Sequence, residues 1–274
     1  MKALSIGIFD SGVGGLTVLK EIKKLLPSEN LIYLGDTARV PYGGRSPQAI
    51  TRYALECALF LLTKGIKLLV IACNVSSAYA LPIIKRKFPI PVLGVIEPGV
   101  KEAIRVTRKK RVGIIGTKGT IRSGVYERYI KKIDPQILVF SKACPLFVPI
   151  VEEGLENDEI AYLSAKKYLY ELKDADVDTL VLGCTHYPVL ENVIKAVLGD
   201  EIRIVHSGQE VAKAVRDLLE KKNLLAKNRS GTLKYFVTDL PGSFIEIGSR
   251  IMGEPITSVR WVRQMDFRNI FFSS

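Results

Sequence analysis

SIGIFDSGVGGL, residues 5–16, is a strand-like apolar run that ends in an acidic residue and a glycine-rich turn. The pattern returns in RVGIIGTKGTIR, residues 111–122, and each run has glycine at its third position. Two further junctions recur in the same order, because Cys184 corresponds to Cys73 and the segment IVHSG corresponds to VIEPG. Three matches in register indicate an internal repeat, so we expect two similar halves.

Strand-length apolar runs alternate with helical patterns along the chain. This alternation predicts mainly parallel sheets that are covered by helices on both faces. We expect the second half to be inserted into the first, so that the chain returns to the first half near its end. The predicted fold is therefore α/β with two pseudo-symmetric domains, residues 1–96 plus 208–274 and residues 97–207, and an active site in the cleft between them.

Two helix starts can be predicted from capping signals. Ser46 precedes Pro47 and a long apolar pattern, which indicates an N-cap followed by proline at the first helical position. Ser207 and Glu210 have the spacing of a capping box, in which each side chain bonds the other residue's backbone N–H. Helices are therefore expected to begin just after Ser46 and just after Ser207.

The composition excludes several classes of protein. No uncharged apolar run approaches the roughly 20 residues that span a bilayer. The first ten residues pass directly into a strand pattern and a charge, so no signal peptide is expected. The four cysteines lack the closely spaced pairs of a zinc site, so we expect no metal and free thiols in a reducing cytoplasm.

The net charge of +12 raises the question of nucleic-acid binding. The basic clusters at residues 85–87 and 108–111 lie at predicted helix ends or among apolar residues at helical spacing, so solvated faces explain them. Neither an aromatic RNA-binding signature nor a zinc-finger spacing is present. We therefore do not expect a nucleic-acid partner, although the charge would attract an anionic small molecule and the lysine excess is typical of heat-adapted proteins.

Cys73 and Cys184 each follow the carboxyl end of a predicted strand, where ligands bind in open α/β sheets. If the two halves face one another, the thiols flank a shared cleft from opposite sides. Two such groups suit a reaction that inverts a carbon: one thiolate removes the α-proton, and the opposite thiol delivers a proton to the other face. Helix N-termini after both cysteines are expected to favour the thiolate form. Either cysteine alone would be interpreted as buried filler.

Polar residues near the same junctions are candidates for the site. Asp10 and Ser11 end the first strand, where an acid would bind an amino group or assist Cys73. His186 would assist Cys184, although a single histidine is more often structural. Thr117 and Thr120 occupy the matching loop of the second half. Cys57, Cys144 and His206 are expected to be structural.

Other functions remain open on the residues alone. Cys184 with His186 would suit a hydrolase that uses a cysteine nucleophile, but this leaves Cys73 unexplained. A protein that binds DNA or an amino acid without catalysis is a third possibility. No lysine has the context of a pyridoxal phosphate Schiff base, and no phosphate-binding loop motif is present, so no cofactor is expected.

Six segments together resemble the glutamate racemase family of the aspartate/glutamate racemases, which are cofactor-independent bacterial enzymes that supply D-glutamate for peptidoglycan. These segments are GIFDSGVGGLTV, YLGDTARVPYG, IACN, GVIEPG, CPLFVPIVEEG and LGCTHYP. They extend from residue 7 to about residue 190. CTHYP together with DSGxGG distinguishes this family from the more distant aspartate racemases.

The resemblance implies roles for individual residues. Cys73 and Cys184 match the two catalytic acid–base cysteines, which act on the D- and the L-enantiomer respectively. Asp10 and His186 match the residues that assist them, and Glu152 matches a third acidic helper. The positions that match substrate contacts or neighbour them are Asp10, Ser11, Tyr42, Gly43, Asn74, Thr117, Thr120, Thr185 and His186.

One position departs from the family pattern. Val75 follows the CN dipeptide where the family usually has threonine. Its backbone N–H can still bind substrate, but the contact of a hydroxyl is lost. The resemblance further implies L- and D-glutamate as substrate and a homodimer as the assembly. Specificity for glutamate rests on this likeness, since the spacing of the two cysteines alone would admit any small α-amino acid.

Overall fold

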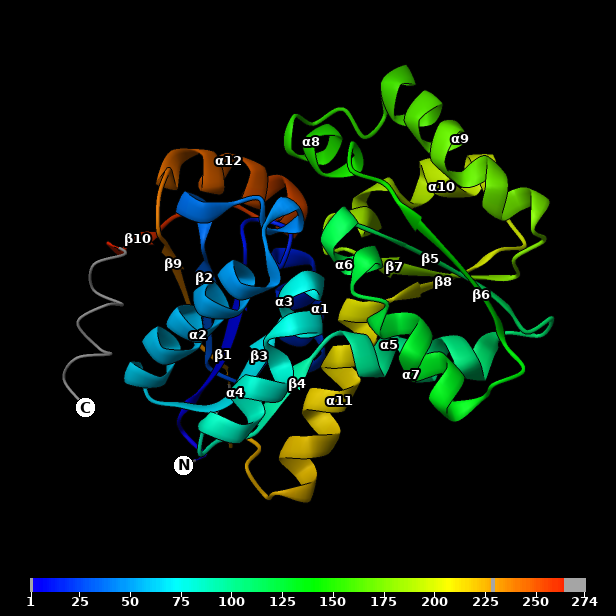
Figure 1. Ribbon diagram of the computed structural model, residues 1–274. Helices are drawn as coiled ribbons and strands as arrows, with labels where there is room; N and C mark the ends of the chain where they lie inside the picture. The colour runs from blue at the N-terminus through cyan, green and yellow to red at the C-terminus, as the bar shows by residue number, and fades with distance from the viewer. Residues whose placement is uncertain (1, 228–229, 264–274) are drawn as a thin grey trace.

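A computed structural model describes residues 2–227 and 230–263; residues 1, 228, 229 and 264–274 of the predicted first domain lie outside this range. Two sheets with exclusively parallel pairing form the framework of the described residues (Figure 1). The first sheet, in the order β10-β9-β2-β1-β3-β4, consists of β1 (Ser5–Asp10), β2 (Leu31–Gly35), β3 (Ile66–Ile71), β4 (Val92–Gly94), β9 (Leu233–Val237) and β10 (Arg260–Trp261). The second, in the order β6-β5-β7-β8, consists of β5 (Arg111–Gly116), β6 (Leu138–Ala143), β7 (Thr179–Gly183) and β8 (Arg203–His206).

The two sheets share one strand order, which confirms the α/β fold class and accounts for the repeat in the sequence. Strands β2-β1-β3-β4 of the first sheet correspond to β6-β5-β7-β8 of the second. The repeated glycines lie in the central strands β1 and β5. A Cβ at Gly7 would lie 2.8 Å from Ile66 of β3, and a Cβ at Gly113 would lie 3.0 Å from Leu180 of β7. In each half the neighbouring strand, β3 or β7, approaches the central strand so closely that only glycine fits at this position.

The helices cover the sheets, and the pair α5 and α11 lies between them (Figure 1). The α-helices are α1 (Leu16–Leu25), α2 (Pro47–Thr63), α3 (Asn74–Tyr79), α4 (Leu81–Lys87), α5 (Ile96–Val106), α6 (Lys118–Arg122), α7 (Val125–Ile133), α8 (Phe147–Glu152), α9 (Glu159–Asp174), α10 (Glu191–Leu198), α11 (Ser207–Lys221) and α12 (Pro241–Met252). Short 3₁₀ helices are η1 (Thr37–Arg39), η2 (Tyr42–Gly44) and η3 (Tyr187–Leu190). None of the helices in the described part of the chain has both the length and the apolar character to cross a membrane.

The hydrophobic core runs without interruption between the two sheets. One buried cluster joins Ile8 of β1 and Ile114 of β5 through Val100 of α5 and Val211 of α11. The opposite face of the first sheet packs a second cluster beneath α2 and α4, so that sheet is buried on both faces. This packing explains why its strands are near-continuous apolar runs.

The capping predictions had different outcomes. Ser46 caps α2 as expected, because its hydroxyl accepts the N–H of Ala49 at 3.2 Å and Pro47 is the first helical residue. The capping box at Ser207 is wrong. Helix α11 already begins at Ser207, whose hydroxyl donates to the carbonyl of Leu182 at 3.4 Å, while Glu210 pairs with Lys213.

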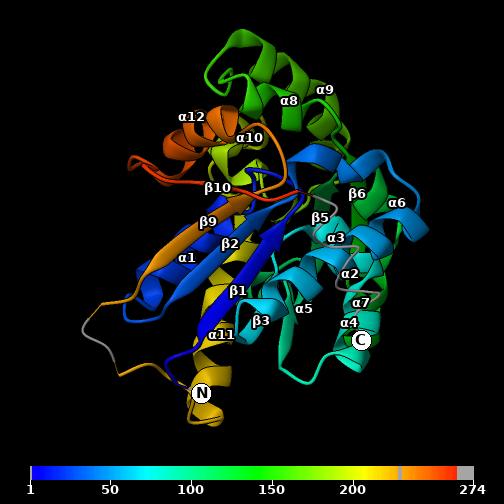
Figure 2. The same ribbon diagram turned by 90° about the vertical axis from the view of Figure 1, so that its left-hand side faces the viewer.

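After α11 the chain returns to the first sheet, where β9 pairs with β2 (Figure 2). A buried ion pair fixes this return: Lys67 Nζ lies 2.6 Å from Glu29 Oε2 and donates to the carbonyl of Leu224 at 2.8 Å. The other carboxylate oxygen of Glu29 accepts the N–H of Ala226. Residues from both ends of the chain therefore build the first sheet, and residues 111–206 supply the strands of the second.

Candidate active site

A narrow cavity of about 40 Å³ lies where the carboxyl ends of the two sheets meet. Cys73 stands two residues beyond β3 and Cys184 follows β7 directly, so the equivalent strands of the two halves each contribute one thiol. A larger hollow of about 380 Å³ adjoins this cavity and shares part of its wall, including Val40, Gly43 and Thr117. The structure thus brings both sulfurs to one cavity with a route toward the surface.

Most of the residues predicted for the site line this cavity. They are Ser11, Tyr42, Gly43, Cys73, Asn74, Val75, Thr117, Thr120, Cys184, Thr185 and His186. Asp10 and Glu152 do not line it. Asp10 bonds the backbone of the loop that follows Ser11, and Glu152 bonds His186 and lines the larger adjoining hollow. In the described part of the chain no group of three His, Cys, Asp or Glu side chains is arranged to hold a metal ion.

The environment of Cys73 favours the neutral thiol. Its sulfur is buried and lies 3.9 Å from the hydroxyl oxygen of Ser11. Burial, together with the nearby charge of Asp10, raises the pKa of Cys73 to about 12. Asp10 is itself buried, and burial raises its pKa although the backbone N–H groups of Gly12 and Gly15 bond its Oδ2 at 3.1 Å. A protonated thiol at Cys73 suits a proton donor.

The environment of Cys184 differs because a histidine supports it. His186 Nδ1 lies 3.8 Å from the sulfur, and His186 Nε2 lies 2.9 Å from Glu152 Oε1. Burial opposes ionisation of this ring, yet the hydrogen bonds and charges of Cys184 and Glu152 raise the pKa of His186 to about 10. The protonated ring of His186 can therefore donate a hydrogen bond to the Cys184 sulfur when that sulfur is a thiolate.

The predicted helix N-terminus after Cys184 is wrong. Cys73 does cap α3, but η3 begins only at Tyr187 and α10 at Glu191. The segment between the strand and η3 lines the cavity through Thr185 and His186, and the His186 ring lies beside the Cys184 sulfur. The two thiols are therefore equivalent in topology but not in their immediate electrostatic surroundings.

Two buried polar atoms near the cavity have no hydrogen-bond partner among the described residues, Asn74 Nδ2 and Asp10 Oδ1. The carbonyl oxygen of the Asn74 side chain accepts a hydrogen bond from Tyr126 at 2.6 Å, which fixes the amide orientation. Buried polar groups without partners are rare, and a ligand would satisfy them. The orientation of Asn74 leaves its Nδ2 as a donor that a bound ligand would satisfy.

Val75 packs across the cleft rather than facing open space. A Cβ at Gly119 of the second half would lie 2.9 Å from a methyl group of Val75 and 2.9 Å from the carbonyl oxygen of Gly43. Three segments thus meet closely at this point. The threonine that the family usually has here would meet the same neighbours, so the substitution replaces a hydroxyl with apolar packing against Gly119.

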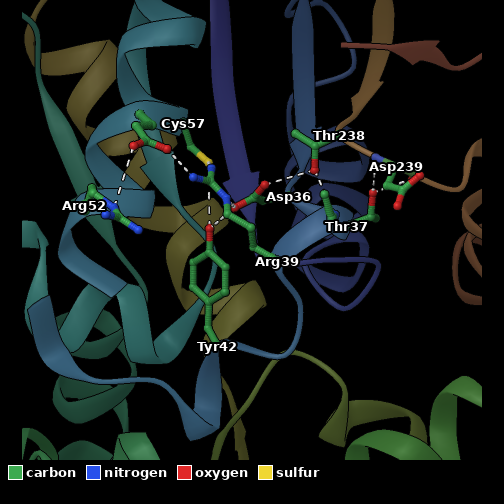
Figure 3. Close-up of polar contacts among 10 residues, drawn as sticks. Asp36, Thr37, Arg39, Tyr42, Arg52, Cys57, Thr238 and Asp239 are labelled. Atoms are coloured by element: carbon green, nitrogen blue, oxygen red, sulfur yellow. Dashed lines mark hydrogen bonds and ion pairs between the residues drawn. The ribbon is translucent and has the colours of Figure 1, made fainter. Parts of the chain in front are cut away.

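The loop that carries Tyr42 and Gly43 rests on a buried polar network that sequence reasoning missed (Figure 3). The carboxylate of Asp36, which is completely buried, accepts hydrogen bonds from Arg39, Tyr42 and Thr238. Arg39 also pairs with Glu56 of α2. Asp36 directly follows β2, and a charged residue at the carboxyl end of a buried strand was the signal that could have revealed it.

Replacing Tyr42 by phenylalanine should loosen this loop. The ring would still fill its place, but the buried carboxylate of Asp36 would lose a donor, which costs about 1.5–3 kcal/mol of the free energy of unfolding. Urea unfolding, in which the midpoint should fall, tests this. The matched control is Tyr53→Phe, because its ring still stacks on Arg39 at 4.3 Å; a loss of equal size in both variants would contradict the prediction.

His186 should make stability depend on pH in a defined direction. Its folded-state pKa of about 10 lies above the ordinary 6.5, so the cation is held more tightly in the folded state. The resulting stabilisation is complete below pH 6.5 and is lost as the pH rises toward 10. Urea unfolding should therefore show a gap between the wild type and His186→Asn that shrinks over this range. A gap independent of pH would contradict the assignment.

Two parallel-sheet halves that share one cavity, with a thiol from each, are the arrangement of an amino acid racemase that does not use pyridoxal phosphate. The profile of the Asp/Glu/Hydantoin racemase family matches residues 6–215. The chain belongs to this family, and within it to the glutamate racemase branch. Its activity is that of an isomerase that does not depend on pyridoxal phosphate.

Individual relatives support this assignment. The chain is 54% identical to the glutamate racemase of Geobacter metallireducens, over 93% of this chain and 95% of the relative. A crystal structure of a glutamate racemase isoform from Bacillus anthracis has a TM-score of 0.93 at 42% identity, covering 96% of this chain and 98% of that one. The Francisella tularensis enzyme in complex with D-glutamate gives 0.92 at 36% identity, covering 97% and 100%.

Proposed function

We propose that this chain interconverts L- and D-glutamate by proton transfer between two cysteines at Cα. The observation that carries the proposal is the meeting of Cys73 and Cys184 in one cavity from equivalent strands of the two halves. The substrate would lie between residues 1–96 plus 208–274 on one side and residues 97–207 on the other. Relatives with bound glutamate support this substrate.

The neutral thiol at Cys73 suits one direction of the reaction. Cys184 as thiolate removes the Cα proton of L-glutamate, and the electron pair of the C–H bond passes into the substrate carboxylate. Cys73, held as a neutral thiol, then delivers its proton to the opposite face and is left as thiolate. Both cysteines exchange protons with solvent before the next turnover, or act in reverse on D-glutamate.

Neighbouring groups have separate tasks in this scheme. The imidazolium of His186 stabilises the Cys184 thiolate, and Glu152 holds the ring. The free donor of Asn74 and the backbone N–H of Val75 bind the substrate carboxylate, whose negative charge grows as the proton leaves. Ser11, Tyr42, Gly43, Thr117, Thr120 and Thr185 form the remaining wall, and Asp10 assists Cys73 from behind it.

The test is racemisation in D₂O without any added cofactor. L-Glutamate should lose its optical rotation, and the D-glutamate that forms should carry deuterium at Cα. L-Aspartate run in parallel measures the specificity, and we expect it to react far more slowly. Racemisation without deuterium at Cα, or none at all, would overturn the mechanism. From the resemblance we further propose a cytoplasmic homodimer whose product supplies peptidoglycan synthesis.

A further inference from the structure

Arg250 of α12 reaches from the first half of the molecule to the end of α8 in the second half. Its Nη2 donates to the carbonyl of Val151 at 2.6 Å and to that of Glu152 at 3.2 Å. Its Nε lies 3.7 Å from a carboxylate oxygen of Glu156. Figure 1 shows α12 beside α8 where the two halves meet.

Backbone hydrogen bonds and Arg250 together close the end of α8. The N–H groups of the turn that follows donate to the carbonyls of Pro149, Ile150 and Val151, and Arg250 adds the bond to the carbonyl of Glu152. With only 6 residues, α8 is too short to be stable by itself and depends on these contacts. The chain then turns at Gly154, whose φ of +74° favours glycine and where a Cβ would lie 2.9 Å from Arg250 Nη1. The turn is therefore shaped around the guanidinium group.

Glu152, the last residue of α8, supports one of the two proposed catalytic cysteines through His186. The side chain of Glu152 bonds His186 Nε2 at 2.9 Å, and His186 Nδ1 lies 3.8 Å from the Cys184 sulfur. Glu152 can hold the ring only while its own backbone stays fixed. Arg250 bonds that backbone, so a continuous series of contacts links α12 to Cys184.

We propose that Arg250 is a positioning residue for the Cys184 half of the reaction. It holds Glu152 against His186, so that the imidazolium remains aimed at the Cys184 sulfur when the two halves close on the substrate. The Cys73 side has no such contact with Arg250 in the described residues. The inference rests on the two-cysteine mechanism proposed above and adds that one side of it depends on a residue across the interface.

Arg250→Ala should lower kcat/KM by between about tenfold and a hundredfold in both directions, because racemisation has an equilibrium constant of one. The part of the effect that is specific to Cys184 shows in the primary deuterium isotope effects on kcat/KM, compared between L- and D-glutamate. Proton removal by Cys184 becomes more rate-limiting, so the isotope effect should rise with [2-²H]-L-glutamate and fall with [2-²H]-D-glutamate. A merely structural role would change both isotope effects equally, and that result would overturn the proposal.

Two further variants make the test independent of folding. Arg250→Lys keeps the charge but loses the planar set of donors, and should show the same isotope asymmetry at smaller size. Lys20→Ala is the matched control, since Lys20 lies in the same wall and its one hydrogen bond among the described residues goes to the carbonyl of Ile251 of α12 at 3.2 Å, away from Glu152. It should leave the isotope effects unchanged, and a Lys20→Ala variant with the Arg250→Ala signature would overturn the proposal.

The surroundings also allow chemical rescue. Arg250 lines a cavity of about 350 Å³ at the junction of the two halves, so a guanidinium ion can enter the space that alanine leaves. Millimolar guanidinium chloride should restore part of the kcat/KM of Arg250→Ala and reverse its isotope asymmetry, without effect on Lys20→Ala. Failure of the two-cysteine mechanism would appear separately, as a wild type that incorporates no deuterium at Cα.

Discussion

Cys73→Ala and Cys184→Ala will each abolish racemisation in both directions, lowering kcat/KM by about 10²- to 10⁴-fold. Each thiol is needed in every turnover, because one removes the proton and the other replaces it on the opposite face. The two variants will still differ in proton exchange. Cys184→Ala retains the base for D-glutamate and should exchange only that enantiomer's Cα proton in D₂O, while Cys73→Ala should exchange only L-glutamate. Chiral chromatography with mass spectrometry measures both.

The same pair of variants decides against a hydrolase. The series Cys184, His186 and Glu152 has the geometry of a nucleophile, a base and an orienting acid, with distances of 3.8 Å and 2.9 Å. A hydrolase built on these three residues would keep its activity in Cys73→Ala. Retained turnover in that variant would contradict the racemase mechanism, whereas loss with the predicted one-sided exchange is explained only by two bases. Cys57→Ala, a buried thiol of α2, serves as the control.

The fold was predictable where the sequence itself repeats. Gly7 and Gly113 lie in the equivalent central strands β1 and β5, and an equivalent neighbouring strand packs on each. The repeated glycine in the sequence therefore indicated the symmetry of the two halves. The same repeat predicted that Cys73 and Cys184 follow equivalent strands of the two halves. Strand β10 was missed because its 2 residues, Arg260 and Trp261, have no apolar periodicity and pair only through their backbone with β9.

The supporting residues behind the site were not predictable from the residues alone. Asp36, Arg39 and Glu56 come from different elements, and the tertiary fold brings them together. Arg250 occupies the polar face of an amphipathic helix, where a charged side chain is most often solvated. Glu152 was identified only by resemblance, because nothing local distinguishes it from Glu153. Sequence periodicity reports which face is buried, but it does not report which charged side chain crosses to another element.

Gly14→Ala should lower kcat/KM by roughly 10²-fold although Gly14 has no functional group. A Cβ at this position would lie 2.4 Å from His186 Nδ1 and 2.4 Å from Thr185 Oγ1, far inside contact distance. Thr17 in the same turn region bonds the carbonyl of Thr185 at 2.9 Å, so the segment cannot simply move aside. The imidazole must therefore shift from its place beside the Cys184 sulfur, and a shift of about 1 Å is enough for a loss of this size.

The matched control for Gly14→Ala is Gly242→Ala, at the start of α12, where a Cβ would meet nothing within 4 Å. Neither glycine has a positive φ, so alanine strains neither backbone and the two variants differ only in what the new methyl group touches. We expect Gly242→Ala to keep wild-type kcat/KM. We expect Gly14→Ala to show in addition the isotope asymmetry of a weakened Cys184 side, measured with [2-²H]-L- and [2-²H]-D-glutamate. Equal activity in the two variants would show that the glycine-rich turn does not set the position of His186.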